Sequence, residues 1–167
     1  LMNYLWSPWR MKYMENNNKV EGCIFCIEQA KTDGAENLIA YRGKYSYVIL
    51  NRYPYTSGHL MIVPFEHQPS IEALSPAVRA EMMELVNTAI GVLRKVYTPE
   101  GFNVGINLGQ PAGAGIVDHM HIHLVPRWTG DTNFMSVVGN TRVLPEEMTA
   151  TAERLRPIFE RLLRERT

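Results

Sequence analysis

The sequence predicts an α+β domain with a mainly antiparallel sheet and flanking helices. Segments rich in β-branched and aromatic residues, which are typical of strands, outnumber the helical segments and do not alternate regularly with them. Two segments repeat apolar residues at the 3.6-residue period of amphipathic helices. One short segment alternates histidines with apolar residues at the two-residue period of a strand. A chain of 167 residues has the usual size of one domain.

Four strands are expected along the chain. Residues 45–50 and 59–63 are dense in β-branched and aromatic side chains and are separated by turn residues, which predicts two strands joined by a loop. A third strand is expected over residues 102–107. A glycine-rich loop, residues 109–115, follows it and leads to a fourth strand over about residues 118–126.

Two amphipathic helices are expected to flank this sheet. Apolar residues recur at the helical period over about residues 76–96, and Ser75 is placed to cap the first turn. A second helix is expected over about residues 145–164. Pro157 lies inside it and predicts a kink or a local break, because proline has no N–H to donate to the preceding turn.

Three parts of the chain are expected. Residues 1–22 are rich in aromatic side chains and are interpreted as an arm that packs on another surface, such as a partner subunit. Residues 23–144 are expected to form the central domain. The helix within residues 145–167 is expected to pack on that same domain.

Charge and hydropathy exclude several classes of protein. Seventeen basic residues balance seventeen acidic ones, so the formal net charge is zero. This balance argues against a nucleic-acid or membrane partner, but it leaves room for a small anion. The chain has no apolar run long enough for a transmembrane helix, and its start lacks the apolar stretch of a signal peptide, so a cytoplasmic protein is expected.

Residues 119–125 alternate His119, His121 and His123 with apolar residues. On a strand the three histidines share one face, whereas residues two apart on a helix do not. Three interpretations are open: satisfied polar residues on a half-exposed sheet, metal ligands, or nucleophilic catalysis. On a strand the outer two histidines stand roughly 13 Å apart. One metal ion cannot bind all three at that separation, so at least one histidine has another role.

Nucleophilic catalysis agrees with the chemistry of imidazole. With a pKa of about 6.5, the ring is largely unprotonated at neutral pH and can attack a phosphorus atom. Neighbouring histidines can then donate hydrogen bonds to the developing oxyanion. The glycine-rich loop allows backbone N–H groups to approach an anion, although a tight turn between strands is its alternative interpretation. Together, the loop and the histidines indicate phosphate chemistry.

The segment of residues 119–125 resembles the signature of the histidine triad family. The resemblance covers about residues 23–126, and the flanking stretches 5–10 and 126–134 are similar to bacterial members of the diadenosine tetraphosphate phosphorylase type. It implies a histidine triad-like fold of sheet and helices, and usually a homodimer. It also implies hydrolysis or transfer at the α-phosphate of a nucleotide, through a nucleotidyl-histidine intermediate.

The resemblance implies a role for each matching residue of the site. His121 would be the nucleophile and His123 would contact the α-phosphate, while Asn51 would hold ribose hydroxyls. Trp128 can stack on a base or simply pack. Residues 115–118 carry no serine or threonine, which leaves the acid that assists the leaving group unidentified. The expected catalytic residues are His59, His119, His121 and His123, and the expected substrate-binding residues are Asn51, Asn107, Ala114, Gly115 and Trp128.

Cys23 and Cys26 form a Cys-x-x-Cys pair without a second pair. Taken alone, this pair has three interpretations: half of a metal-binding site, a redox-active pair, or two buried thiols. The family resemblance implies a structural zinc site completed by His67 and His119, and the alternative for His67 is a surface histidine. Four nitrogen and sulfur ligands would make a closed tetrahedral site.

The function that these features favour is cleavage of a diadenosine polyphosphate with phosphate as the acceptor. The alternatives are hydrolysis of a nucleotide ester or phosphoramidate, a nucleotide-binding module without activity, and a metal-binding structural protein. We expect a small nucleotide as the substrate, a homodimer, no nucleic-acid or membrane partner, and no organic cofactor.

Overall fold

The fold is seen in a computed structural model, which describes residues 22–33, 37–131 and 147–165. The arm expected over residues 1–22 therefore lies outside the described residues, apart from Gly22. The elements are α2 (Ile24–Ala30), β1 (Ile39–Arg42), β2 (Ser46–Leu50), β3 (Leu60–Pro64), η1 (Ile71–Ala73), α3 (Pro76–Tyr97), β4 (Gly101–Ile106), η2 (Gln110–Ala112), β5 (Ile122–Arg127) and α5 (Met148–Arg164).

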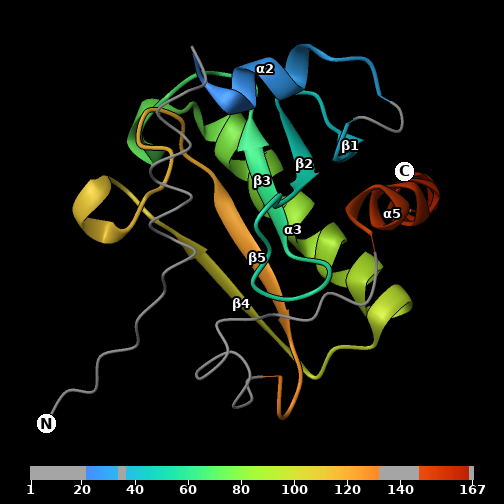
Figure 1. The fold of residues 1–167 in the computed structure, drawn as a ribbon. Coiled ribbons are helices and arrows are strands. Elements are labelled where there is room, and N and C mark those ends of the chain that lie inside the picture. The colour runs from blue at the N-terminus through green and yellow to red at the C-terminus, as the bar shows by residue number, and fades with distance from the viewer. Residues whose placement is uncertain (1–21, 34–36, 132–146, 166–167) are drawn as a thin grey trace, which may run out of the picture.

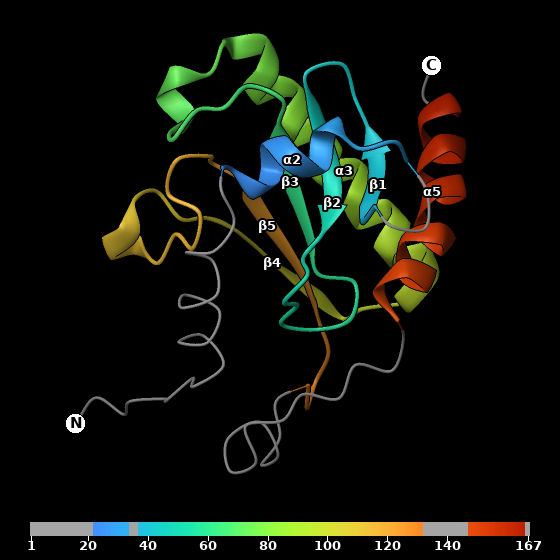
Figure 2. The same ribbon diagram turned by 45° about the horizontal axis from the view of Figure 1, so that its top comes forward.

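One antiparallel sheet of five strands organises the described residues, in the order β1-β2-β3-β5-β4. Helix α3 lies behind the sheet, and α5 packs against α3 and β1, while α2 lies on the opposite side of the sheet at one end (Figures 1 and 2). The predicted α+β class with a mainly antiparallel sheet is confirmed. No helix among the described residues is both long and apolar enough to span a membrane.

The two faces of the sheet follow the alternation of side chains along each strand. On the face toward α3, Ser46 donates a hydrogen bond to Glu81 of that helix. On the other face, Tyr47 donates to the Phe25 carbonyl of α2 at 2.9 Å, and Ile49 and Met61 pair across β2 and β3. Every residue of β2 and β3 is buried, because helices or loops cover both faces there.

The long helix α3 agrees closely with its sequence pattern. It begins after Ser75, whose hydroxyl accepts a hydrogen bond from the Val78 N–H, as expected of a capping serine. Helix α5 continues through Pro157, so the local break is absent. Pro157 and Glu153 are exposed, so the Glu153 carbonyl that loses its partner can bond to water, while Leu155 and Phe159 are fully buried and anchor the helix.

Four elements have no counterpart in the predicted order: α2, β1 and the three-residue helices η1 and η2. Helix α2 has seven residues and β1 has four, and such short segments do not complete enough periods to be recognised. The strand expected over residues 118–126 begins only at Ile122, because its pairing with β3 ends there, opposite Ile62, and its other partner, β4, ends opposite it at Ile106. Before it, the Met120 N–H donates a single hydrogen bond to the Gln68 carbonyl at 2.7 Å.

Candidate active site and metal centre

The face of the sheet that carries α2 also carries the histidines. Met120, Ile122 and Leu124 are buried in the hydrophobic core, so the alternating histidines point the other way, although His119 and His121 precede the strand. The Phe25 ring of α2 lies against both, with ring centroids 5.4 Å from His119 and 4.9 Å from His121. The alternation of residues 119–125 is therefore as predicted, but two histidines lie outside β5.

Cys23, Cys26, His67 and His119 form one cluster, in which the four ligand atoms lie within 4.8 Å of one another. The His119 Nδ1 lies 3.4 Å from the Cys23 sulfur and 3.7 Å from the Cys26 sulfur, and the His67 Nδ1 lies 3.3 Å from the Cys26 sulfur. A tetrahedral zinc with the usual bond lengths separates a sulfur from a nitrogen ligand by about 3.5 Å. The distances and the donor set therefore fit zinc.

Hydrogen bonding prepares His119 to act as a ligand. Its Nε2 lies 2.9 Å from the Pro64 carbonyl, which can only accept, so Nε2 carries the proton and Nδ1 presents a lone pair to the two thiols. Burial lowers the pKa of His119, which favours the neutral ring that a metal requires. His67 is exposed and closes the cluster from the solvent side.

His121 has the opposite tautomer. Its Nδ1 lies 3.0 Å from the His119 carbonyl and must donate to it, which leaves the lone pair on Nε2. His121 is only 5% exposed, and burial lowers its pKa, so the ring is neutral at physiological pH. The residue lines a cavity, and its ring stands edge-on to His123 with centroids 4.7 Å apart. The neutral ring and the lone pair on Nε2 are what a nucleophile needs.

A chain of hydrogen bonds also fixes the tautomer of His123. The Tyr55 backbone N–H donates to His59 Nδ1 at 3.1 Å, so the proton of His59 is on Nε2. That Nε2 lies 3.0 Å from His123 Nδ1 and donates to it, which places the His123 proton on its own Nε2. His59 is fully buried behind His123. His123 is therefore arranged as a donor beside the lone pair of His121.

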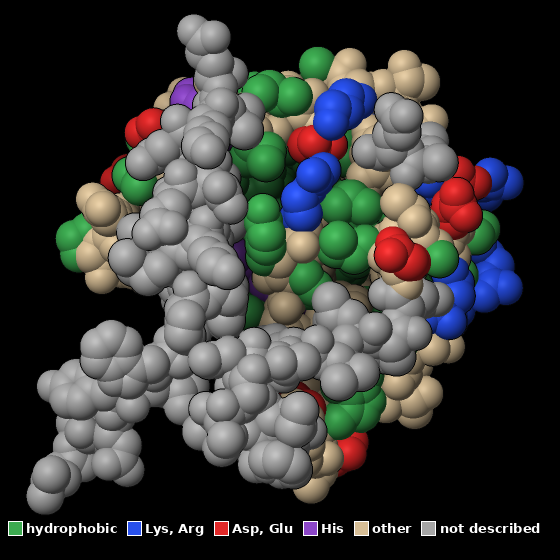
Figure 3. Space-filling view, viewed as in Figure 1, with side chains coloured by type: hydrophobic (Ala, Val, Ile, Leu, Met, Phe, Trp, Pro, Cys, Tyr) green, Lys and Arg blue, Asp and Glu red, His purple; other side chains and the backbone are tan. Residues whose placement is uncertain are grey.

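The cavity in front of these two histidines has a volume of about 630 Å³. In the space-filling view, hydrophobic side chains gather on this face beside a few charged ones, and a narrow strip of histidine surface is visible next to them (Figure 3). Of the substrate-binding residues expected from the sequence, Asn51, Asn107, Ala114 and Gly115 line this cavity.

The glycine-rich loop is partly self-bonded. The Asn107 amide donates to the Gly113 carbonyl at 3.4 Å. The N–H groups of Gly113 and Ala114 donate to the carbonyls of Gln110 and Gly109. The N–H of Ala114, one of the expected substrate-binding residues, is therefore engaged within the loop.

Trp128 is set apart from the other predicted residues. It follows β5, five residues beyond His123, which is roughly 16 Å along an extended strand, and it is not among the described residues that line the cavity. Its backbone N–H donates to Asp131. A stacking role for Trp128 stays a prediction.

Sequence reasoning missed several residues of the cavity, above all Phe25, Glu28, Arg52 and Tyr55. Phe25 lies inside the Cys-x-x-Cys pair, and Tyr55 stacks on His59 with ring centroids 4.8 Å apart. Ile24 and Glu28 are four residues apart, a spacing that places two side chains on the same face once the segment is recognised as a helix. Because α2 has only seven residues, its sequence does not identify it as a helix, and the place of Glu28 in the cavity was therefore not predictable.

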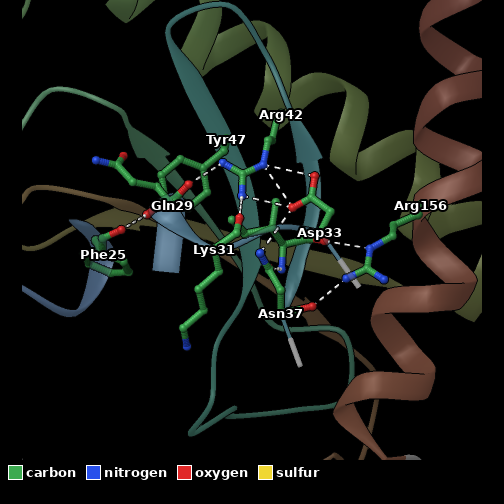
Figure 4. A network of polar contacts seen from close by, with 9 residues as sticks. Phe25, Gln29, Lys31, Asp33, Asn37, Arg42, Tyr47 and Arg156 are labelled. Atoms are coloured by element: carbon green, nitrogen blue, oxygen red, sulfur yellow. Dashed lines mark hydrogen bonds and ion pairs between the residues drawn. The ribbon is translucent and has the colours of Figure 1, made fainter. Parts of the chain in front are cut away.

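A polar network holds α2 against the sheet (Figure 4). The Arg42 guanidinium of β1 donates to the Gln29 and Lys31 carbonyls at the end of α2, at 2.8 and 2.9 Å, and pairs with Asp33. From α5, Arg156 donates to the Ile39 carbonyl at 2.9 Å. The Arg42 bonds satisfy carbonyls at the end of α2, and the Arg156 bond ties α5 to β1. Together they position α2, which carries Cys26, follows Cys23 and forms one cavity wall.

Comparison with known proteins agrees with this geometry. The model of the HIT domain matches residues 33–130. The chain is 40% identical over 149 residues to a Mycobacterium tuberculosis protein named AP-4-A phosphorylase, a match that covers 85% of this chain and 76% of that protein. It is 31% identical over 93 residues to a Schizosaccharomyces pombe protein named asymmetrical bis(5'-nucleosyl)-tetraphosphatase, covering 56% of this chain and 50% of that protein.

Solved structures share the fold. A zinc-bound histidine triad family protein from Mycobacterium smegmatis superposes with a TM-score of 0.68 at 24% sequence identity, over 86% of this chain and 97% of that one. The expected histidine triad-like fold is thus confirmed. With the family model matching more than half of its residues, this chain belongs to the HIT domain family.

Proposed function

We propose that this chain is a nucleotidyl-transferring enzyme that cleaves diadenosine polyphosphates at the α-phosphate and passes the nucleotide to inorganic phosphate. The observation that carries the proposal is the pair of opposite tautomers at the cavity, a lone pair on His121 Nε2 beside a proton on His123 Nε2. The likeness to a protein named AP-4-A phosphorylase supports this choice of substrate.

In the first step, the lone pair of His121 Nε2 attacks the α-phosphorus. A nitrogen–phosphorus bond forms, the bond from phosphorus to the bridging oxygen breaks, and the remaining nucleoside polyphosphate leaves as an anion. The ring becomes positively charged, and its Nδ1–H bond to the His119 carbonyl stabilises that charge. His123 Nε2–H donates to the phosphoryl oxygens, whose charge grows in the transition state.

In the second step, an oxygen of inorganic phosphate attacks the same phosphorus and the bond to His121 breaks. Diadenosine tetraphosphate and phosphate then give ATP and ADP, whereas attack by water gives ATP and AMP. His121 returns to its neutral state, and the bonds through His59 keep His123 in its tautomer throughout. Asn51 and Gly115, which line the cavity, are proposed to hold the ribose and the phosphate respectively.

Zinc is proposed as a structural ion held by Cys23, Cys26, His67 and His119, and the name of the zinc-bound neighbour supports this. When bound, it would cross-link the start of α2 to the end of β3 and to the segment that carries His121. The side chains of those four residues supply no step of the transfer. This proposal leaves His121 and His123 for the phosphate, which agrees with the sequence argument that one metal ion cannot bind all three histidines.

The experiment is to incubate the purified protein with diadenosine tetraphosphate, with and without inorganic phosphate, and to separate the products. The proposal predicts ADP and ATP in equal amounts, and ADP only when phosphate is present. AMP and ATP formed at the same rate without phosphate would identify a hydrolase instead. No product under either condition would overturn the proposal.

The organisation of the chain stays a proposal as well. We keep residues 23–144 as the catalytic domain, with the C-terminal helix packed on it, and we propose a cytoplasmic homodimer without a nucleic-acid or membrane partner. Light scattering of the full chain would test the dimer, with a mass of twice 19.1 kDa as the expected result.

A further inference from the structure

Glu28 is a buried carboxylate that the proposed reaction does not use. The residue is 7% exposed and lines the cavity from α2, on the same face of the helix as Ile24. Its Oε1 pairs with Lys31 Nζ at 2.6 Å and lies 3.7 Å from an Arg52 guanidinium nitrogen. Its Oε2 is also buried, and no described residue donates a hydrogen bond to it. A buried acceptor without a donor destabilises the protein unless something else satisfies it.

The surroundings of Glu28 suit a flat, mostly apolar ligand group. Ile24, Phe25, Leu38, Ile49 and Leu50 line the same cavity as Glu28. Among the described residues that line the cavity, Glu28 is the only Asp or Glu. Apolar walls with a few directed polar groups are typical of a site that fixes the orientation of a ring.

His121, His123 and Glu28 line the same cavity. The Phe25 ring lies beside His121, with centroids 4.9 Å apart. Glu28 lies three residues further along α2, about 4.5 Å along the helix axis and away from the cysteines at its start. A nucleotide whose α-phosphate meets His121 therefore directs its base past Phe25 toward Glu28.

We propose that Glu28 selects the nucleobase, with Oε2 accepting a hydrogen bond from the exocyclic amino group of adenine. This inference rests on the proposed function, because it assumes that the cavity holds a nucleotide. The amino group supplies the donor that Oε2 lacks. A base with a carbonyl at the same ring position places an acceptor against the carboxylate and is rejected, since two buried acceptors then face each other.

Binding of three monophosphates to the zinc-loaded protein separates the gain from the amino group from the penalty for a carbonyl at the same ring position. AMP carries the amino group, purine riboside 5'-monophosphate carries hydrogen in its place, and IMP carries a carbonyl oxygen. Calorimetric Kd values should rank AMP as the tightest ligand and IMP as the weakest. The gap between AMP and purine riboside 5'-monophosphate should be roughly tenfold, the usual scale of one hydrogen bond to a charged group. This comparison needs no variant, so it does not depend on the folding of one.

The variant Glu28→Gln keeps the shape of the side chain but can present either an oxygen or an N–H to the base. We expect the preference for AMP over IMP to fall to less than about threefold, because the amide satisfies either base. Glu84→Gln is the matched control, since Glu84 is an exposed residue of α3. It should keep the preference of the wild-type protein, and both variants should keep the zinc content of the wild type.

Equal Kd values for the three monophosphates in the wild-type protein, or an unchanged preference in Glu28→Gln, would overturn the role of Glu28. If diadenosine tetraphosphate is still cleaved in that case, the proposed function stands and only the inference about Glu28 fails. If no monophosphate binds and the dinucleotide is not cleaved, both proposals fail together.

Discussion

Two histidines only two residues apart, His119 and His121, are given opposite chemistry by the carbonyl that each one meets. His119 donates from Nε2 to the Pro64 carbonyl, so its Nδ1 faces the thiols of Cys23 and Cys26. His121 donates from Nδ1 to the His119 carbonyl, so its Nε2 keeps the lone pair at the cavity. The same side chain thus becomes a candidate metal ligand in one place and a candidate nucleophile in the other.

The comparison shows that neither the residue type nor its burial decides the role. Both rings are buried, and burial lowers the pKa of both, so both are neutral and both can offer a lone pair. The backbone acceptor decides which nitrogen carries it and therefore where it points. Substitutions around His121 should then lower turnover, whereas substitutions around His119 should lower the metal content.

The largest expected effect is on the nucleophile. We expect His121→Ala to lower kcat for diadenosine tetraphosphate by at least about a thousandfold, because no other described group supplies a lone pair at that position. Product formation followed by chromatography measures the loss, and zinc content and AMP affinity serve as controls that should change little. Activity within tenfold of the wild type would show that His121 is not the nucleophile.

On the metal side, Cys26→Ser should remove zinc and lower stability. A change of a few kcal/mol in the free energy of unfolding corresponds to a fall in Tm of about 10 °C in a chain of this size. Metal analysis should give close to one zinc per wild-type chain and almost none in the variant, and thermal unfolding gives the shift in Tm. A metal-free wild-type protein, or a variant of equal Tm, would contradict the zinc proposal.

A smaller loss of activity is expected when His59, which lies behind His123, is replaced. His59→Phe keeps a ring of similar shape but removes the donor to His123 Nδ1, so His123 no longer keeps its proton on Nε2. We expect kcat to fall roughly 10- to 100-fold. The loss is smaller than for removal of a transition-state donor, because the His123 side chain stays in the site and only the position of its proton is no longer fixed. The zinc content should not change. A fall in zinc content with normal kcat would reverse the division between the two groups of histidines.

The smallest effect is expected at His67, the exposed member of the cluster. His67→Gln should weaken zinc binding, since three protein ligands and water replace four protein ligands, while kcat at saturating zinc stays within about twofold of the wild type. Competition with a chromophoric chelator measures the affinity. A large fall in kcat at saturating zinc would show that the metal centre takes part in turnover.

Much of this arrangement was predictable from periodicity. The period of two over residues 119–125 predicted that the histidines lie opposite Met120, Ile122 and Leu124, and those apolar residues are buried. The period of 3.6 and the capping Ser75 predicted α3 closely. Patterns that are local and several periods long carry enough information to fix an element.

The rest depends on contacts between distant segments. The Cys-x-x-Cys pair left three interpretations open, and only the approach of His67 and His119 favours one of them. The tautomer of His119 depends on the carbonyl of Pro64, which is 55 residues away in the sequence. No pattern in the sequence indicates a role for Glu28. Its significance comes from a short helix and from a cavity that residues of several other elements complete.

The most direct test of the division between the two histidines is to locate the covalent intermediate. Zinc-loaded protein is mixed with diadenosine tetraphosphate without phosphate, denatured within one turnover, and mapped by peptide mass spectrometry. The account predicts an adenylyl group on His121 and none on His119 or His123. An adenylyl group on His119, or ATP released in the first turnover without any protein adduct, would contradict it.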